Sequence, residues 1–206
     1  MGKNFETCQS GFRQMVSFPP LAPSSAWWNK YLVAIRTGKQ GKEALEFANS
    51  FLSSGKEFGR YVIADTKGSP LILSVAVEGG GRQLRDISRI PDLRLSEHGE
   101  WRKNHLRAIE ACLGKKPFFR FFEEELSRIY LNREIASLKE FNTAIFRMFS
   151  SFLMENIKDT DLRRYFENGP VVERGREIAK GIRPEESVVQ ALMEYGKETL
   201  LGILAL

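Results

Sequence analysis

The chain has 206 residues, 42% of them hydrophobic, which suits a globular domain with a sizeable core and excludes a disordered chain. Its formal net charge of +5, from 31 basic and 26 acidic residues, suits an anionic ligand but is too weak by itself to argue for nucleic-acid binding, so nucleic acid is not expected as the partner. No apolar run approaches the length of a membrane span, and residues 1–10 lack the apolar core of a signal peptide. Because two cysteines make neither a disulfide framework nor a metal cluster, we expect a cytoplasmic protein.

The first elements in chain order lead into a Pro-rich turn. Residues 12–18 are compatible with a short strand that runs into the turn at 19–23, where prolines forbid a helix. Ser24 or Ser25 can cap a helix over 26–36. Residues 43–52 fit both a helix and a strand, and this alternative stays open on pattern alone.

A β-hairpin is the clearest prediction in the first half. YVIA at 61–64 and LILSVAV at 71–77 flank a turn in which Gly68 supplies a positive φ. The second strand is almost wholly apolar, so we expect it to be buried on both faces inside a sheet. Residues 84–90 alternate loosely and are compatible with a third short strand.

The second half reads as helical. Ser96 is a candidate N-cap for a helix that Gly114 would end in the left-handed region, and Pro117 would open the next. Ser137 and Glu140 form a capping-box pattern before a long apolar-striped helix. A break at 168–170, a short helix at 171–180 and an amphipathic helix from Pro184 complete the chain. The prediction is an α/β fold in one domain, 1–206, in which a small mixed sheet from residues 1–95 is packed by helices from residues 96–206.

His98, His105 and Cys112 recur every seven residues, a spacing that suggests a metal site or a Cys–His dyad. Seven residues of helix rise about 10.5 Å, which is too far for shared ligation or for activation of a thiolate. His105 alone remains a candidate general base or phosphate ligand, since the basic residues around it would keep it neutral near pH 7. A histidine satisfied by a neighbouring helix is an equal alternative.

A loop with three glycines, 79–81, precedes Arg82 and is compatible with an anion cradle. Its spacing is neither a P-loop nor GxGxxG, so a plain flexible loop is the favoured interpretation. The sequence also contains no GxSxG motif and no triad spacing.

Residues 71–142 resemble the WbqC-like protein family. The resemblance is carried by LSVAVEGG from Leu73, by Asp86-Ile87, by W-x3-H from Trp101 to His105, by R-x-I-E from Arg107, and by Gly114, Pro117–Phe119 and SLKEFN at 137–142. Further upstream, Ser17 to Pro20, Asn49 and Arg60 stand where the family has a Pro-rich motif and a polar strand. That correspondence favours an irregular strand or loop at 43–52.

The chain also departs from the family pattern. A Gln-Pro near the N-terminus is absent, Leu113 replaces an aromatic residue, and Gln190 and Glu194 stand where the closing motif has Asp and Asn.

The resemblance implies a cytoplasmic bacterial transferase acting on a nucleotide-activated sugar or similar anionic small molecule in surface polysaccharide (O-antigen) biosynthesis. His105 would be the catalytic base or a phosphate ligand. The substrate would be held by Ser17, Asn49, Arg60, Arg82, Trp101, Lys103 and Arg107. The departures favour an alternative, a non-catalytic binding or assembly protein. Metal binding is not expected, and the sequence specifies neither a cofactor nor an oligomeric state.

Overall fold

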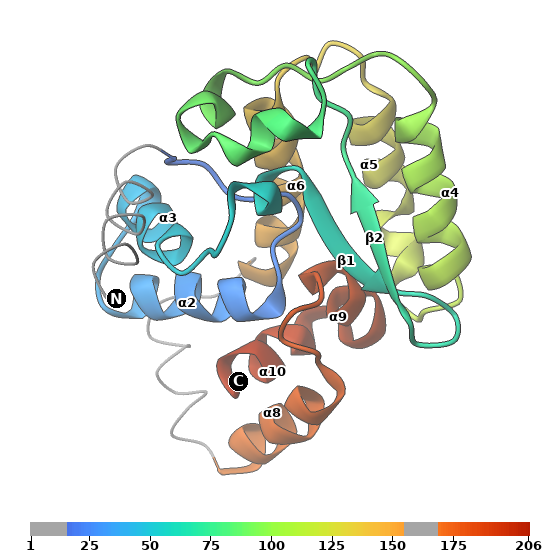
Figure 1. Ribbon diagram of the computed structural model, residues 1–206. Coiled ribbons are helices and arrows are strands. Elements are labelled where there is room, and N and C mark those ends of the chain that lie inside the picture. Colours follow the sequence, from blue (N-terminus) through green and yellow to red (C-terminus); the bar gives the residue numbers. More distant parts are fainter. Residues whose placement is uncertain (1–15, 155–168) are drawn as a thin grey trace, which may run out of the picture.

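The structure is a computed structural model that describes residues 16–154 and 169–206 (Figure 1). The helices are α2 (Ser25–Arg36), α3 (Gly41–Asn49), α4 (Trp101–Leu113), α5 (Phe119–Leu131), α6 (Leu138–Met154), α8 (Gly169–Gly181), α9 (Val188–Tyr195) and α10 (Thr199–Leu204). The strands are β1 (Arg60–Ala64) and β2 (Pro70–Ser74). Short 3-10 helices are η1 (Gly55–Phe58), η2 (Gly81–Arg85), η3 (Ile87–Asp92) and η4 (Gly196–Glu198).

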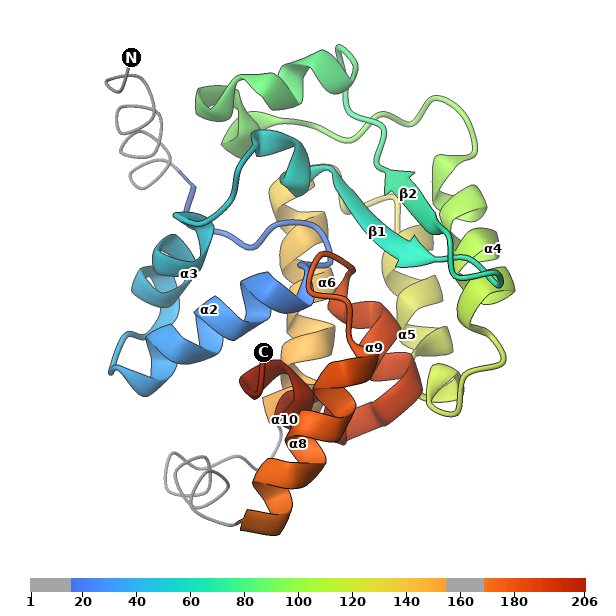
Figure 2. The same ribbon diagram turned by 60° about the horizontal axis from the view of Figure 1, so that its bottom comes forward.

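The helices surround α6, which runs through the middle of the molecule in both ribbon views (Figures 1 and 2). Helices α2 and α3 lie on one side of α6, and α4 and α5 lie on the other with the β1–β2 hairpin beside them. Helices α8, α9 and α10 gather at one end (Figure 2). Buried apolar residues from Val16 to Ile203 form one continuous core. In the part of the chain that the structure describes, none of the helices has the length and apolarity needed to span a bilayer.

The predicted α/β class is confirmed, and the sheet consists of one antiparallel hairpin in the described residues. β1 pairs with β2 from Arg60↔Ser74 to Ala64↔Pro70. The turn forms because the Asp65 carboxylate accepts the backbone N–H groups of Lys67 and Ser69, each at 2.8 Å, and Gly68 takes a φ of 82°.

The prediction that β2 is buried on both faces was wrong. Ile72 is 54% exposed while Leu73 is 6% exposed, so the strand has one solvent face and one core face. In the described residues no second sheet packs on the hairpin, and helices cover only one of its two faces. Val75 and Val77 are buried, but they lie beyond the ladder.

Two further segments are not strands, namely 43–52, where an irregular strand or loop was favoured, and 84–90, where a short strand was predicted. Residues 43–52 fall mostly within α3, because Ala44 and Ala48, four residues apart, bury one helical face. Residues 84–90 form parts of η2 and η3, with Asp86 capping η3 through Ser88. The strand predicted at 12–18 lies partly outside the described residues, and its described part, 16–18, is not a strand.

The helix-end signals had mixed outcomes. Ser24 caps α2 as one of the two predicted candidates, and the Ser137–Glu140 capping box is confirmed, with both of its hydrogen bonds at 3.1 Å. Ser96, in contrast, lies five residues before α4 and accepts from His98 in the loop. Gly114 keeps a right-handed φ of −60°, so the predicted left-handed stop was wrong.

The C-terminal third also departs in detail from the pattern. At the 168–170 break, residue 168 lies outside the described chain, while Gly169 and Pro170 begin α8. The last amphipathic helix is split at Gly196, whose φ of 56° ends α9.

The Pro-rich segment 16–24 is held in place by two buried side-chain amides. Asn49 donates through Nδ2 to the carbonyls of Val16 and Phe18, both at 3.0 Å. Asn142 of α6 donates to the carbonyls of Pro19, at 3.2 Å, and Phe58, at 2.9 Å. These bonds matter because prolines leave carbonyls that must be satisfied while supplying no N–H of their own.

We predict that Asn142→Ala lowers the free energy of unfolding by about 2–4 kcal/mol, because it leaves two buried carbonyls without a hydrogen-bond donor and opens a small cavity. Urea denaturation measures the change. Asn104→Ala on the exposed face of α4 is the matched control and should shift stability by less than about 0.5 kcal/mol. Equal effects of the two substitutions would contradict the role given to Asn142.

Candidate functional site

Two hollows flank the point where α2 and α9 begin. There Ser24 and Ser187, the N-caps of the two helices, form an isolated antiparallel bridge. The backbone N–H of Ser25 donates to Glu186, and that of Val188 donates to Pro23, both at 2.9 Å. Since protein carbonyls already occupy these N–H groups, the two helix N-termini do not form an anion site by themselves.

The first hollow, the Arg60 hollow, has a volume of about 300 Å³. Its walls come from the Pro-rich segment, the start of β1 and the loop before α9. They consist of Pro20, Leu21, Ala22, Pro23, Ser24, Trp27, Leu52, Ser53, Glu57, Arg60, Tyr61, Val62, Glu185 and Ser187. Arg60 and the Pro-rich turn, which the sequence singled out separately, therefore share one cavity.

Ala22 bends the chain at the wall of the Arg60 hollow. It is 2% exposed and has a φ of 40°, in the left-handed region that a non-glycine residue rarely adopts. Its carbonyl accepts the Ser187 hydroxyl at 2.7 Å, which offsets part of the strain. The backbone around this hollow is thus fixed by long-range contacts.

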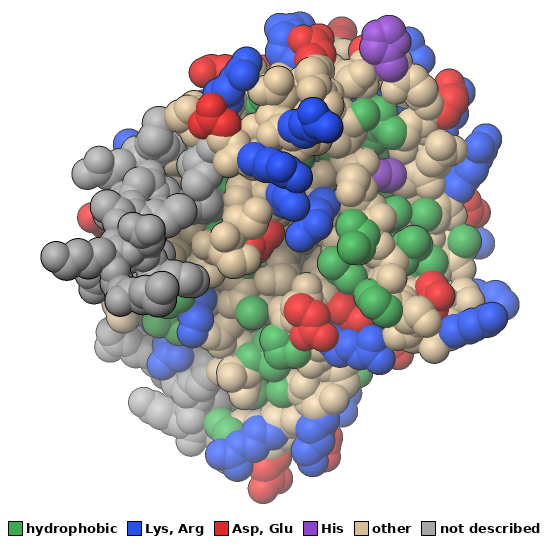
Figure 3. Space-filling view, viewed as in Figure 1, with side chains coloured by type: hydrophobic (Ala, Val, Ile, Leu, Met, Phe, Trp, Pro, Cys, Tyr) green, Lys and Arg blue, Asp and Glu red, His purple; other side chains and the backbone are tan. Residues whose placement is uncertain are grey.

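Three arginines follow one another close to the Arg60 hollow. Arg82 and Arg85 of η2 and Arg89 of η3, together called the arginine row, are all exposed. Among the described residues, no hydrogen bond or ion pair engages their guanidinium groups. η2 packs beside Arg60, because the Leu84 side chain lies so close to Gly59 that an added Cβ would meet it at 2.5 Å. Figure 3 shows Lys and Arg side chains gathered on this face above its recessed centre.

The second hollow, the Ser25 hollow, has a volume of about 270 Å³ and lies on the other side of the Ser24–Ser187 bridge. Its lining is Ser25, Lys116, Gly181, Ile182, Arg183, Glu186, Ser187, Gln190, Ala191, Glu194 and Tyr195. Gln190 and Glu194, the two departures in the closing motif, thus face the same cavity. Sequence reasoning missed this hollow, although the spacing of four residues between Gln190 and Glu194 on one helix places them on one face.

His105 is enclosed by aromatic rings and is only 6% exposed, so it does not lie in the open cationic groove that we expected. The rings of Trp101, Tyr61 and Tyr130 surround it at centroid distances of 5.3, 6.3 and 5.9 Å. Its Nε2 bonds to the Ser74 carbonyl at 3.0 Å, and Nδ1 is buried without a partner. Nε2 is therefore engaged by the backbone, and Nδ1 is shielded from solvent.

The lowered pKa predicted for His105 is confirmed in direction, but its cause is different. Burial lowers the pKa to about 4, and the hydrogen bond to the Ser74 carbonyl opposes this shift. The neighbouring cations were expected to be the cause, but Lys103 and Arg107 point to solvent and Arg102 is paired.

Trp101 is also a core residue and is bonded rather than free to stack on a ligand. It is 9% exposed, and its Nε1–H donates to the Ser96 carbonyl at 2.8 Å. Beneath it, Tyr61 and Tyr130 share a hydrogen bond at 2.8 Å, and burial raises the pKa of both phenols. This cluster ties β1 to α4 and α5.

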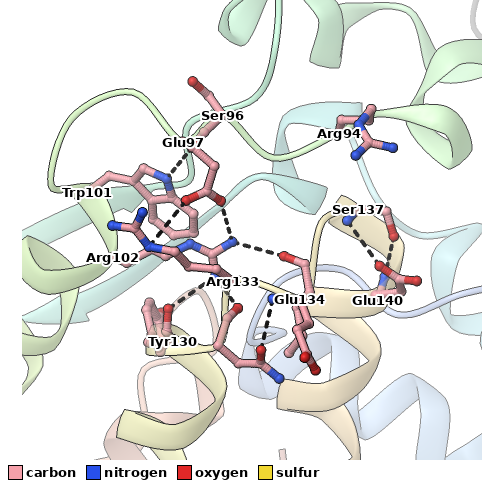
Figure 4. Close-up of polar contacts among 12 residues, drawn as sticks. Arg94, Ser96, Glu97, Trp101, Arg102, Tyr130, Arg133, Glu134, Ser137 and Glu140 are labelled. Carbon is pink, nitrogen blue, oxygen red and sulfur yellow. Dashed lines mark hydrogen bonds and ion pairs between the residues drawn. The ribbon is translucent and has the colours of Figure 1, made fainter.

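Arg102 was not selected from the sequence, yet it organises the end of α5 (Figure 4). Its guanidinium lies over the Trp101 ring at 4.9 Å and donates to the carbonyls of Tyr130 and Ile135 at 3.1 and 2.9 Å. Glu97 accepts from it at 3.1 Å and also approaches Arg133. Satisfied carbonyls and a carboxylate explain how this side chain is only 7% exposed.

The remaining predicted binding residues do not converge on one point. Asn49 is fully buried, and its Oδ1 accepts the indole N–H of Trp27 at 3.0 Å, so all its bonds are internal. Ser17 is half-buried, while Lys103 and Arg107 are exposed on α4, where Lys103 pairs with Glu100 at 2.8 Å. Of the predicted residues, Arg60 lines the Arg60 hollow, and Arg82 lies on the adjacent η2. No cluster of metal-ligating side chains occurs within the described ranges 16–154 and 169–206.

Comparison with known proteins assigns the family. The sequence model of the WbqC-like protein family matches residues 53–180, which is more than half of the chain. The matched range includes Arg60, the arginine row and His105, whereas Ser17, Asn49 and the closing motif fall outside it. Neither a curated protein nor a solved structure gives a significant match.

We predict that buried His105 makes stability fall with acid. Its folded pKa of about 4 lies below the ordinary 6.5, so the stability it contributes is complete above pH 6.5 and is lost as the pH falls toward 4. The loss amounts to at most about 3 kcal/mol. Urea unfolding at several pH values measures the free energy of unfolding against pH. His105→Gln should flatten this dependence between pH 6.5 and pH 4. His98→Gln, at an exposed loop position, is the control and should leave the slope intact. The same slope in both variants would contradict the prediction.

Proposed function

The chain belongs to the WbqC-like protein family, and on that premise we propose that it is a cytoplasmic transferase in bacterial surface polysaccharide (O-antigen) biosynthesis. Its substrate is a nucleotide-activated sugar or a similar anionic small molecule. The observation that carries this proposal is the unpaired arginine row beside a cavity that contains a fourth arginine, Arg60.

The arginines supply the anion site in this proposal. A planar guanidinium offers paired N–H donors that match the oxygens of a phosphate, and it stays charged at any physiological pH. Arg94, by contrast, approaches Glu78 at 3.8 Å and is partly compensated. The uncompensated charge at Arg82, Arg85 and Arg89 attracts a di-anion to this edge, and Arg60 receives it at the mouth of the hollow.

The Arg60 hollow supplies the rest of the binding site. Trp27, Tyr61 and Pro20 give it an apolar wall, while Glu57 and Glu185 add hydrogen-bond acceptors for hydroxyl groups. A volume of about 300 Å³ accommodates part of a nucleotide sugar and leaves its diphosphate at the rim.

In this proposal His105 is a positioning residue. It contacts Tyr61, which lines the hollow, and its Nε2 holds the backbone where β2 ends. The general-base role predicted from the sequence stays a prediction, and the enclosed ring does not favour it. Lys103 and Arg107 stay predictions as phosphate ligands.

A non-catalytic binding or assembly protein is the second candidate. It is favoured by the burial of His105 and by the lack of any hydrogen bond between a histidine ring and a serine or cysteine side chain within the described residues. Binding without turnover would follow from the same arginines and the same hollow.

We predict that nucleoside diphosphate sugars bind saturably and that Arg60→Gln and Arg82→Gln each weaken binding by roughly tenfold, since a hydrogen bond to a charged group contributes about 1.5–3 kcal/mol. Isothermal titration with UDP-, dTDP- and GDP-linked sugars measures the affinities. Arg120→Gln, on exposed α5 away from either hollow, is the matched control and should bind like the wild type.

The outcomes separate the two candidates. Binding with release of a nucleotide in the presence of acceptor sugars supports the transferase. Binding that never leads to turnover supports the non-catalytic alternative. If none of the nucleotide sugars binds, or if Arg60→Gln and Arg120→Gln behave alike, the proposal is overturned.

A further inference from the structure

The Ser25 hollow has a charge-balanced polar lining. Lys116 pairs with Glu194 at 2.5 Å, and Arg183 pairs with Glu186 at 3.1 Å. Arg183 also donates to the Gly68 carbonyl at 2.9 Å. Two cations and two carboxylates therefore face the same space, and each cation is already engaged by a carboxylate.

Two hydrogen-bonding groups in this hollow are free. Ser25 is 1% exposed, and its Oγ has no partner among the described residues. Gln190 accepts the backbone N–H of Ala64 at 3.3 Å through Oε1, which leaves the two N–H donors of Nε2 available. A buried hydroxyl without a partner costs about 1–3 kcal/mol, so its presence at a cavity wall indicates a partner that arrives from outside.

We propose that the Ser25 hollow binds a neutral, polyhydroxylated ring, a monosaccharide in chemical class. Each hydroxyl of such a ring donates one hydrogen bond and accepts two, so it can give to Glu186 or Glu194 and accept from Lys116, Arg183 or Gln190. The Ser25 hydroxyl can either donate a hydrogen bond to the ring or accept one from it. The hollow presents both donors and acceptors, which is what a polyol requires.

Charge and size exclude the other ligand classes. An anion or a cation would have to break one of the two ion pairs and leave a carboxylate or an ammonium group uncompensated. The volume of about 270 Å³ lies below the usual range of drug-sized sites, about 300–1,000 Å³, and suits a single ring. Tyr195 adds the aromatic surface that covers the apolar face of the ring.

This site is independent of the proposed nucleotide site. The arginine row and Arg60 do not line the Ser25 hollow, and the Ser24–Ser187 bridge separates the two cavities. Loss of nucleotide binding would therefore leave this inference intact, and the reverse also holds.

Ser25→Ala is the sharpest test, because the hydroxyl it removes bonds to nothing in the folded chain. We expect the variant to unfold at the same or a slightly higher temperature than the wild type. In a ligand-observed NMR titration with glucose, galactose and N-acetylglucosamine, its affinity should fall by roughly fivefold. Gln190→Glu keeps the acceptor for Ala64 and removes both donors, and it should lower affinity similarly.

The control variant is Ser127→Ala, which removes a hydroxyl on α5 that lines neither hollow and should leave monosaccharide affinity unchanged. Glucosamine tests the charge argument and should bind more weakly than glucose. The proposal fails if no neutral monosaccharide binds saturably, if Ser25→Ala binds as the wild type does, or if a charged sugar binds more tightly. A hollow that holds water alone would give the first of these results.

Discussion

The arrangement of this protein depends on two buried amides that bind the backbone of the Pro-rich segment. Asn49 and Asn142 approach residues 16–20 from α3 and α6 and together satisfy three of its carbonyls. Such a segment cannot join a sheet or a helix, since its prolines lack the N–H groups and the φ freedom that these structures require. Side-chain donors from elsewhere in the chain take over that function. The segment can therefore run through the core and still emerge at the point where α2 begins.

Both hollows follow from that path. Beyond the amides, the Ser187 hydroxyl bonds to Ala22, and the N–H of Val188 bonds to Pro23, so the starts of α2 and α9 are locked together. The locked junction forms a wall with one cavity on each side. One cavity opens toward cations without partners, and the other is lined by ion pairs. The two cavities therefore differ in their electrostatics, although a single structural constraint positions both.

The aromatic cluster around His105 performs a different task. Trp101, Tyr61 and Tyr130 enclose the imidazole, and Arg102 covers Trp101 from the other side. The family's W-x3-H spacing is thereby explained in part by packing, because residues four apart on a helix share a face. Here the histidine contacts Tyr61 and the Ser74 carbonyl of the hairpin, and the tryptophan packs against the histidine. The histidine remains neutral because burial opposes its charged form.

Local signals in the sequence determined several elements. The hairpin at 61–74, the capping box at Ser137 and the helix capped by Ser24 were predicted because their hydrogen bonds are made between near neighbours. The family assignment also came from the sequence, through spacings that the matched range 53–180 contains. Residues 43–52 could not be decided in this way, since their apolar residues fit two periods and only burial against α2 selects the helix.

The tertiary structure alone decided which polar residues are internal and which line a cavity. In the sequence, Asn49 and His105 look the same whether their side chains bind a substrate or a backbone carbonyl. The carbonyls that they contact belong to residues about 30 positions away in the chain. Arg60 and Ser25 face cavities because segments from both ends of the chain close around them. Burial is a property of such long-range contacts, and a pattern within one stretch of sequence cannot contain it.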